Sequence, residues 1–239
     1  MAEMAIGWLD AAALVFFVAA WTLYHKLLES RRFGRLSLNA LMHRYRMAWM
    51  DEMLHREVRI IDTQIMASLQ NGTAFFASTS LFVVGGSLAL LRAADDVLRI
   101  FGDLPLSIPA SRAVWEMKVI GLTVIFVYAF FKFAWSYRLF NYAAILIGAT
   151  PSGDRAKTPE ARLHVLRTGD VITDAGRQFN RGQRAFFFAL AYAAWFISPW
   201  AMIGATVAVL FAMLMRQYRS AAHDAVVGLS HGKPANEPD

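Results

Sequence analysis

The stretch VIGLTVIFVYAFF, residues 119–131, contains no charged side chain, and Lys118 and Lys132 bracket it. Comparable apolar runs occupy residues 81–91 and 185–195, and the sequence between the runs is strongly charged. A bilayer core requires roughly 20 apolar residues per helix, because only a helix hides its peptide groups from lipid there. This alternation predicts an all-α, polytopic membrane helix bundle, with about four long transmembrane helices and cytoplasmic helical extensions.

Composition and charge favour the same class. Hydrophobic residues make up 57% of the 239 positions, whereas a soluble domain has roughly 45–50%. The formal net charge is +6, and the Lys and Arg residues flank the apolar runs, where basic residues of membrane proteins accumulate. We therefore expect a lipid bilayer as a partner and no nucleic acid. The absence of cysteine excludes disulfides, thiolate catalysis and cysteine-ligated metal centres.

The first half of the chain predicts two spans joined by a cytoplasmic helix. The first span covers residues 6–28 and is expected to be retained, because the amino terminus lacks the basic region of a cleavable signal peptide. Residues 39–66 form an amphipathic pattern that is too charged to cross a bilayer. This pattern continues without a clear breaker into a second span over residues 68–91. A break at Asn71-Gly72 is the alternative.

The second half predicts two more spans. The third begins near Ala113 and continues as one long helix to residue 149, because a strong stop signal follows at 148–151. After a hydrophilic loop and a surface helix over residues 161–179, the last span covers residues 183–215. Pro199 must kink or break it. We expect one kinked helix that protrudes from the bilayer, and a re-entrant hairpin at Pro199 is the alternative.

Domain organisation and orientation follow from the same pattern. Residues 1–229 are expected to form a single integral membrane domain, and residues 230–239 a disordered tail. Basic residues concentrate in the first and third connections, which predicts that these lie in the cytoplasm and the amino terminus in the periplasm. Four spans would return the carboxyl terminus outside. Arg216 and Arg219 fit that placement poorly and fit the hairpin alternative better.

Several long and unusual motifs resemble a known family. They are Ser37-Leu38-Asn39, Met42-His43-Arg44-Tyr45-Arg46, Trp49-Met50, Arg56-Glu57 with Arg59-Ile60-Ile61-Asp62, the stretch FFASTS at 75–80, Lys118, the stretch YAFFKFAWSYR at 128–138, the stretch FNRGQRAFFFALAY at 179–192, and Ser198-Pro199-Trp200. The chain resembles the bacterial and plant membrane family catalogued as domain of unknown function 599, over nearly its whole length. The resemblance implies a multi-span protein of a bacterial inner membrane and lends no reaction.

Basic residues near the spans are candidates for ion or lipid contact: Lys118, Lys132, Arg138, Arg181 and Arg184. If Lys132 lies deep in the membrane, it needs a carboxylate or carbonyl partner and indicates an ion pathway. If it lies at the cytoplasmic boundary, its ammonium group snorkels to water, and we favour this interpretation. Asp10 lies near the opposite boundary, so we expect no direct pair between it and Lys132.

No motif predicts chemistry. Glu52 and His55 have the spacing of a di-metal helix motif, but such sites need a second copy and further carboxylates, which the sequence lacks. We therefore expect no catalytic residue, no metal site and no cofactor, and do not expect an enzyme.

The leading functional hypothesis is an oligomeric or complex-forming structural subunit of the membrane. Small residues allow helices to approach closely in lipid, and the candidates for such contacts are Ser78, Gly85, Gly86, Gly204 and Ala208. The alternative hypothesis is a channel or transporter for a small, perhaps anionic, solute, with the basic helices as a positive vestibule.

Overall fold

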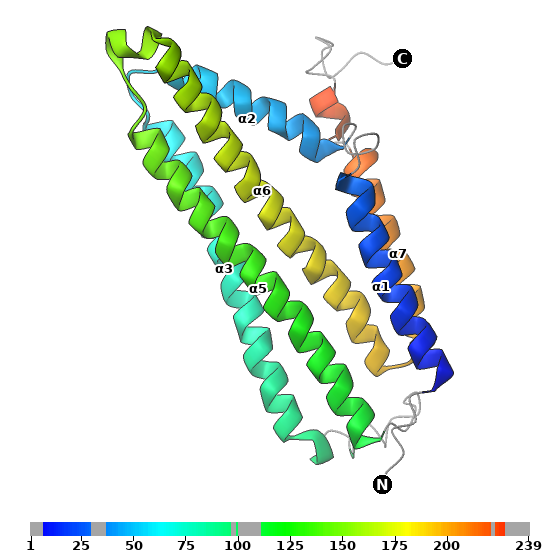
Figure 1. The fold of residues 1–239 in the computed structure, drawn as a ribbon. Coiled ribbons are helices and arrows are strands. Elements are labelled where there is room, and N and C mark those ends of the chain that lie inside the picture. Colours follow the sequence, from blue (N-terminus) through cyan, green and yellow to red (C-terminus); the bar gives the residue numbers. More distant parts are fainter. Residues whose placement is uncertain (1–6, 30–36, 97–98, 100–110, 221–222, 228–239) are drawn as a thin grey trace. The chain divides into compact units, whose positions relative to one another are not determined.

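Every regular element is helical among the described residues, which are 7–29, 37–96, 99, 111–220 and 223–227 of this computed structural model (Figure 1). The α-helices are α1 (Trp8–Glu29), α2 (Leu38–Leu54), α3 (Ile60–Arg92), α5 (Arg112–Gly148), α6 (Pro159–Ala193) and α7 (Pro199–Tyr218). The 3-10 helices η2 (Gly153–Lys157) and η3 (Ala194–Phe196) follow α5 and α6. The predicted all-α class is confirmed.

Four helical segments are long and apolar enough to cross a membrane: α1, α3, α5 and the segment that begins at Pro199. α3 has 33 residues and α5 has 37, so they measure about 50 Å and 55 Å at about 1.5 Å per residue. A hydrocarbon core is only about 30 Å thick. Both helices therefore extend well beyond the lipid, as the sequence predicts for the helix that begins near Ala113.

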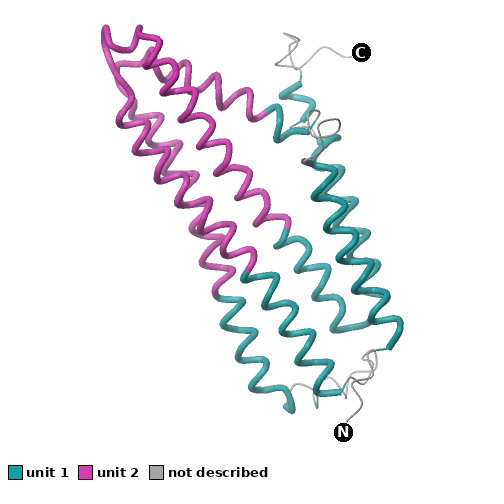
Figure 2. Tube along the Cα trace, in the orientation of Figure 1, with its two compact units in different colours: residues 1–41, 82–127, 185–239 teal, residues 42–81, 128–184 magenta. Residues whose placement is uncertain are grey.

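The chain divides into two compact units (Figure 2). The first contains residues 1–41, 82–127 and 185–239, and the second contains residues 42–81 and 128–184. Four helices, α2, α3, α5 and α6, contribute residues to both units.

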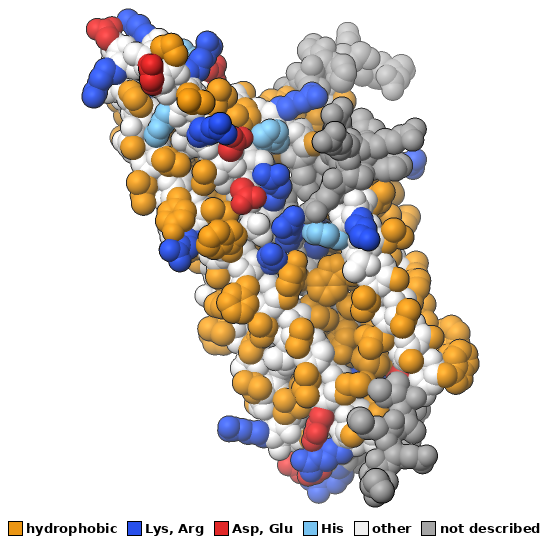
Figure 3. Space-filling model, viewed as in Figure 1, with side chains coloured by type: hydrophobic (Ala, Val, Ile, Leu, Met, Phe, Trp, Pro, Cys, Tyr) orange, Lys and Arg blue, Asp and Glu red, His pale blue; other side chains and the backbone are white. Residues whose placement is uncertain are grey.

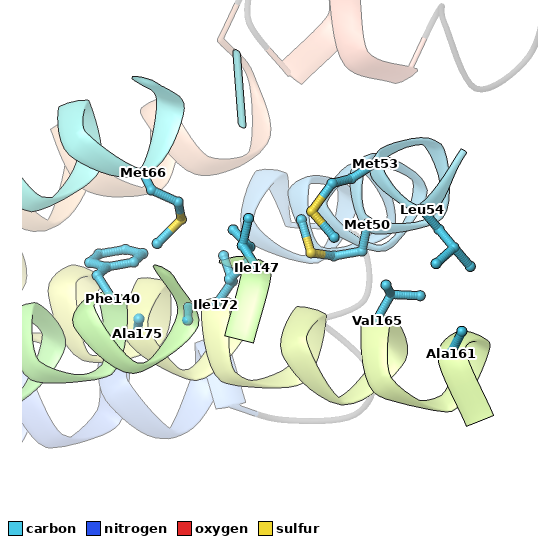
Figure 4. Close-up of a cluster of buried hydrophobic side chains, with 11 residues drawn as sticks. Met50, Met53, Leu54, Met66, Phe140, Ile147, Ala161, Val165, Ile172 and Ala175 are labelled. Atoms are coloured by element: carbon cyan, nitrogen blue, oxygen red, sulfur yellow. The ribbon is translucent and has the colours of Figure 1, made fainter. Parts of the chain in front are cut away.

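In the second unit, buried side chains of α2, α3, α5 and α6 form one core (Figure 4). They are Met50, Met53, Leu54, Met66, Phe140, Ala143, Ile147, Ala161, Val165, Ile172 and Ala175. Methionine is unbranched, so its side chain fills irregular gaps between helices. The predicted apolar stripe of the amphipathic segment packs against other helices at Met50 and Leu54, whereas its later members Val58, Ile61 and Ile65 are exposed.

In the first unit, α1 and α7 lie side by side and run in the same direction (Figure 1). The end of α6 packs on α1 through aromatic rings: the ring of Phe188 stacks on Trp21 at 5.3 Å between centroids and meets Phe17 edge-on at 5.7 Å. Phe188 is fully buried. These contacts bury apolar side chains of the last turns of α6 against α1.

The predicted single helix over residues 39–66 is wrong, and so is the alternative break at Asn71-Gly72, whereas the continuity from residue 60 into the second span is confirmed. α2 ends at Leu54 and α3 begins at Ile60, whereas Asn71 and Gly72 lie inside α3. The break has no glycine or proline. Its turn is closed by hydrogen bonds from His55 N to Glu52 O and from Arg56 N to Met53 O, at 3.2 Å each. Local propensity alone does not end a helix there, so side-chain contacts described below must hold the turn.

The prediction of a single kinked helix over residues 183–215 is also wrong. α6 runs unbroken from Pro159 to Ala193, so the expected surface helix and the start of the last span are one helix. After η3, Ser198 caps α7, its Oγ accepting a hydrogen bond from Ala201 N at 3.0 Å, and Pro199 occupies the first turn. Proline fits that position because its missing N–H would have no helical partner. Pro199 therefore starts a new helix, as the hairpin alternative has it.

Other expectations have mixed outcomes. The first span is confirmed as α1, and η2 lies within the hydrophilic loop after α5. The tail expected at 230–239 lies outside the described residues.

Candidate functional site

Lys118 is a buried cation on an apolar helix of the first unit. It lies in the second turn of α5, and only 7% of its surface is exposed. Its Nζ donates a hydrogen bond to the carbonyl oxygen of Trp195 at 2.8 Å and lies 5.0 Å from the centroid of the Trp195 ring. A buried ammonium group is costly unless it is paired, and the carbonyl and the ring both stabilise it.

Asp10 completes this cluster from a third segment. Its Oδ1 accepts a hydrogen bond from Trp195 Nε1 at 2.7 Å and lies 3.9 Å from Lys118 Nζ. The cation and the carboxylate balance each other, and Trp195 touches both. We call Asp10, Lys118 and Trp195 the charge cluster.

Helix ends explain where these groups lie. Asp10 is in the first turn of α1, where an acidic side chain faces the positive end of the helix dipole. Trp195 is in η3, which terminates α6. There the carbonyl of Ala194 accepts from Ile197 N and Ser198 N, and the carbonyl of Trp195 accepts from Lys118. A cation at the carboxyl end of a helix complements its dipole, so the cluster joins α1, α5 and the end of α6.

A second charged group lies in the other unit, around Asp62 of α3. Asp62 is fully buried, and its Oδ1 accepts from Trp49 Nε1 and from Arg56 NH1, at 2.6 Å each. Its Oδ2 has no hydrogen-bond partner among the described residues. Arg56 belongs to the turn between α2 and α3, so its ion pair fixes that turn against α3.

Arg59, at the end of the same turn, caps another helix. Its two terminal nitrogens donate to the carbonyl oxygens of Thr150 and Pro151, at 2.6 Å and 2.7 Å. These carbonyls follow the end of α5, where helical partners run out. Arg56 and Arg59 together explain why the chain breaks between α2 and α3 without a glycine or proline.

Lys132 and Arg138 each lie beside a tyrosine of α5. Lys132 is half-buried, with its Nζ 5.3 Å from the centroid of the Tyr128 ring. Arg138 is exposed and donates from Nε to Tyr142 Oη at 2.5 Å. Lys132 is separated from Arg112 by about 30 Å of helix, the thickness of a hydrocarbon core. This spacing agrees with a boundary position for Lys132 if Arg112 lies at the other boundary, which stays a prediction.

Arg181 and Arg184 lie on α6, one turn apart. Arg184 is buried and Arg181 is half-buried. Neither side chain therefore extends freely into solvent.

The small residues that the sequence proposes for helix contact all face outward in the single chain. Ser78, Gly85, Gly86, Gly204 and Ala208 are exposed. A Cβ added at Gly85, Gly86 or Gly204 would meet no atom within 4 Å. None of these glycines brings two helices of the same chain together, so their role in an assembly stays a prediction.

Other glycines make the close approaches within the chain. A Cβ at Gly121 of α5 would overlap Tyr192 Oη, and one at Gly182 of α6 would lie 2.7 Å from the Phe133 ring. A Cβ at Gly169 would lie 2.7 Å from Met47 Sδ. Sequence reasoning missed these positions, since large or charged residues flank each glycine and no small-residue motif marks it.

Asp10 and Trp195 were also missed as partners of Lys118. The signal available was that Asp10 and Lys118 each lie near the start of an apolar helix whose starts face the same side in the expected topology. Among the described residues, no three His, Asp or Glu side chains gather as metal ligands would.

Comparison with known protein families shows which family this chain belongs to. The sequence pattern of a family described as a protein of unknown function, DUF599, matches residues 12–222. The chain belongs to the DUF599 family. The match covers α2, α3, α5, α6, α7 and all but the first turn of α1. Both the charge cluster and the Asp62 group have members within it. No curated protein and no solved structure matches the chain.

Proposed function

We propose that this DUF599 protein is a bacterial inner-membrane subunit that self-associates, or joins a larger membrane complex, through the exposed face of α3. The proposal assigns it no catalytic step and no cofactor. The amino terminus would lie in the periplasm, and the basic connections in the cytoplasm, by the distribution of Lys and Arg.

The observation that carries the proposal is how little of α3 the chain itself covers. Within the most apolar stretch of α3, only 11% of the residues are buried by the rest of the chain, whereas the corresponding share in α5 is 33%. Large side chains such as Phe82 stand out from it, at 80% exposure, beside Ser78, Gly85 and Gly86. Figure 3 shows hydrophobic side chains covering much of the surface of the spans. A helix with small residues between large ones offers a groove that a second helix fills well.

The test is Gly85→Leu in the full-length protein, with mass measured by light scattering in a mild detergent. Wild type is expected to run as an oligomer and the variant as a smaller species, because the leucine side chain fills the groove. Gly148→Leu is the matched control, since Gly148 is an exposed helical glycine at the far end of α5. A wild-type monomer, or an unchanged mass in Gly85→Leu, contradicts the proposal.

The charge cluster favours a second candidate function, the transport of a small solute. An ionisable pair among apolar helices is a common component of ion and proton pathways. The test is an ion-flux assay in liposomes that compares wild type with Lys118→Met. Flux that disappears in the variant supports transport, and an absence of flux under every gradient removes this candidate.

A further inference from the structure

α2 and α6 lie against each other in the second unit, with a polar contact near the start of α2. His43 Nδ1 and Thr173 Oγ1 are 3.0 Å apart. Further along α2, Met47 fills the space left by Gly169. Later residues of α2 meet earlier residues of α6, so the helices are antiparallel, and the start of α2 lies beside the part of α6 that leads toward Arg184.

Arg46 lies in this interface without a counter-charge. Its side chain passes over Gly176, where an added Cβ would lie 3.0 Å from a terminal guanidinium nitrogen. No ion pair or hydrogen bond joins Arg46 to another residue that the structure describes. Burial lowers the pKa of its guanidinium group. The nearby carboxylates of α6 have other partners, because Asp174 lies 3.5 Å from Arg177 and Asp170 3.7 Å from Arg167.

A further basic group occupies the same side of α6. Arg184 follows Thr173 by eleven residues, which is close to three full turns, so both lie on one face of the helix. Arg184 is buried. The face of α6 that meets His43 therefore carries a second guanidinium group about 16 Å further along the helix axis.

The depth of Arg46 relative to Lys132 indicates what could neutralise it. Phe133, next to Lys132 on α5, fills the space at Gly182 of α6. Gly176 lies six residues before Gly182, about 9 Å along the axis and away from the apolar part of α6. If Lys132 marks the edge of the hydrocarbon, the contact of Arg46 with Gly176 lies about 9 Å beyond that edge, close to the outer limit of the headgroup layer, which is roughly 5–8 Å thick.

We propose that Arg46, with His43 one turn before it on α2, forms a binding site for a phosphate group, and that Arg184 adds positive charge further along the same face of α6. An anionic lipid headgroup is the source that fits its depth. A guanidinium group binds phosphate through two parallel N–H···O bonds, which a lysine cannot reproduce. Gly176 keeps the guanidinium in place, since any side chain there would displace it.

The experiment titrates short-chain phosphatidic acid into the full-length protein purified in detergent and follows intrinsic tryptophan fluorescence. We expect saturable binding that weakens about tenfold in Arg46→Gln, because a charge-assisted bidentate contact is lost. Arg46→Lys should weaken it nearly as much, although the charge remains. Arg44→Gln is the matched control, since Arg44 is an exposed arginine of the same helix, and it should change affinity by less than about twofold.

Further measurements separate the steric role of Gly176 from the loss of charge, and separate a lipid headgroup from free phosphate as the ligand. Gly176→Ala should weaken binding without removing any charge, whereas Gly72→Ala, in open space, should not. Short-chain phosphatidylcholine should bind more weakly than phosphatidic acid. Inorganic phosphate that binds as tightly as the lipid would overturn a lipid source. Circular dichroism and thermal melting confirm that each variant is folded. Equal losses in Arg46→Gln and Arg44→Gln, or no saturable binding by wild type, overturn the proposal.

Discussion

Lys118 illustrates how a charge is tolerated among apolar helices. Its ammonium group touches a carbonyl from η3 and lies near a carboxylate from α1, and the tryptophan between them contacts both. Removing one member leaves the other charge buried and poorly paired, which is more costly than removing both.

We therefore predict strong coupling between Lys118→Met and Asp10→Asn. Each single variant should lose about 2 kcal/mol of stability, and the double variant should lose less than the sum of the two by about 1 kcal/mol. Thermal unfolding in one detergent, followed by circular dichroism, measures all four proteins of the cycle. Additive losses would show that the two groups do not interact.

At Asp62 we predict a larger loss from a single change. Arg56→Ala removes the ion-pair partner of a fully buried carboxylate, which should cost about 3 kcal/mol. Arg167→Ala is the control, because Arg167 and its partner Asp170 are both largely exposed and such pairs contribute little. Equal melting temperatures for the two variants would refute this role of Arg56.

Sequence alone identified some of these residues but not their partners. Lys118 stands out as a charge in an apolar run, yet its hydrogen-bond acceptor is 77 residues away in the chain, and Asp10 and Trp195 are 185 residues apart. Asp62 gave no signal beyond its place in a polar stripe. Which distant groups meet depends on how the helices pack, and hydrophobic periodicity does not encode it.

At the scale of an element, α5 meets the end of α6 at a glycine. We predict that Gly121→Ala destabilises the protein by about 2 kcal/mol, because its Cβ would overlap Tyr192 Oη and lie 2.8 Å from Cζ. Gly204→Ala, on the exposed face of α7, should be neutral or should stabilise by up to about 1 kcal/mol, the helix propensity gain. Thermal melting of both variants checks this.

A second substitution tests whether the clash with Tyr192 causes the loss of stability. Tyr192→Phe removes the oxygen that meets the new methyl group, so it should recover part of the loss in Gly121→Ala. A Gly121→Ala protein as stable as wild type would show that the two helices do not approach as described.

The helix boundaries show which helix ends can be predicted from local sequence and which cannot. α1 and α5 were predicted nearly to their ends, because long apolar runs and the stop after Gly148 are local signals. The break before Ile60 was missed, since Arg56 and Arg59 hold it through distant partners. The separation of α6 from α7 was missed as well. Pro199 indicated a kink or break, but apolar residues continue on both sides of it and favoured a single span, whereas Ser198 and Pro199 together start a new helix.

For the whole molecule, the parallel course of α1 and α7 predicts the sidedness of four positions in the first unit. The chain has no cysteine, so single cysteines can be introduced without background. Cysteines at Lys26 and Arg219 should react from one side of the membrane, and cysteines at Arg112 and Ile197 from the other, because all four positions are exposed at helix ends. A membrane-impermeant maleimide applied to intact and to opened cells measures this.

One outcome of that labelling would contradict the helix order. If the cysteine at Arg219 reacts from the same side as the cysteine at Arg112, the helix that begins at Pro199 does not return across the membrane. That result would favour the single kinked span that the sequence predicts.

The partnership of α1 with the end of α6 has a consequence for biogenesis. Phe17 and Trp21 are synthesised long before Phe188, whose ring they contact in the folded protein. α6 is not among the segments apolar enough to insert by itself. We therefore expect its second half to enter the bilayer beside helices that are already there. Until then the nascent chain holds Asp10 and Lys118 in lipid without Trp195, so a ribosome stalled before α7 would leave an intermediate that an insertase or a membrane protease recognises.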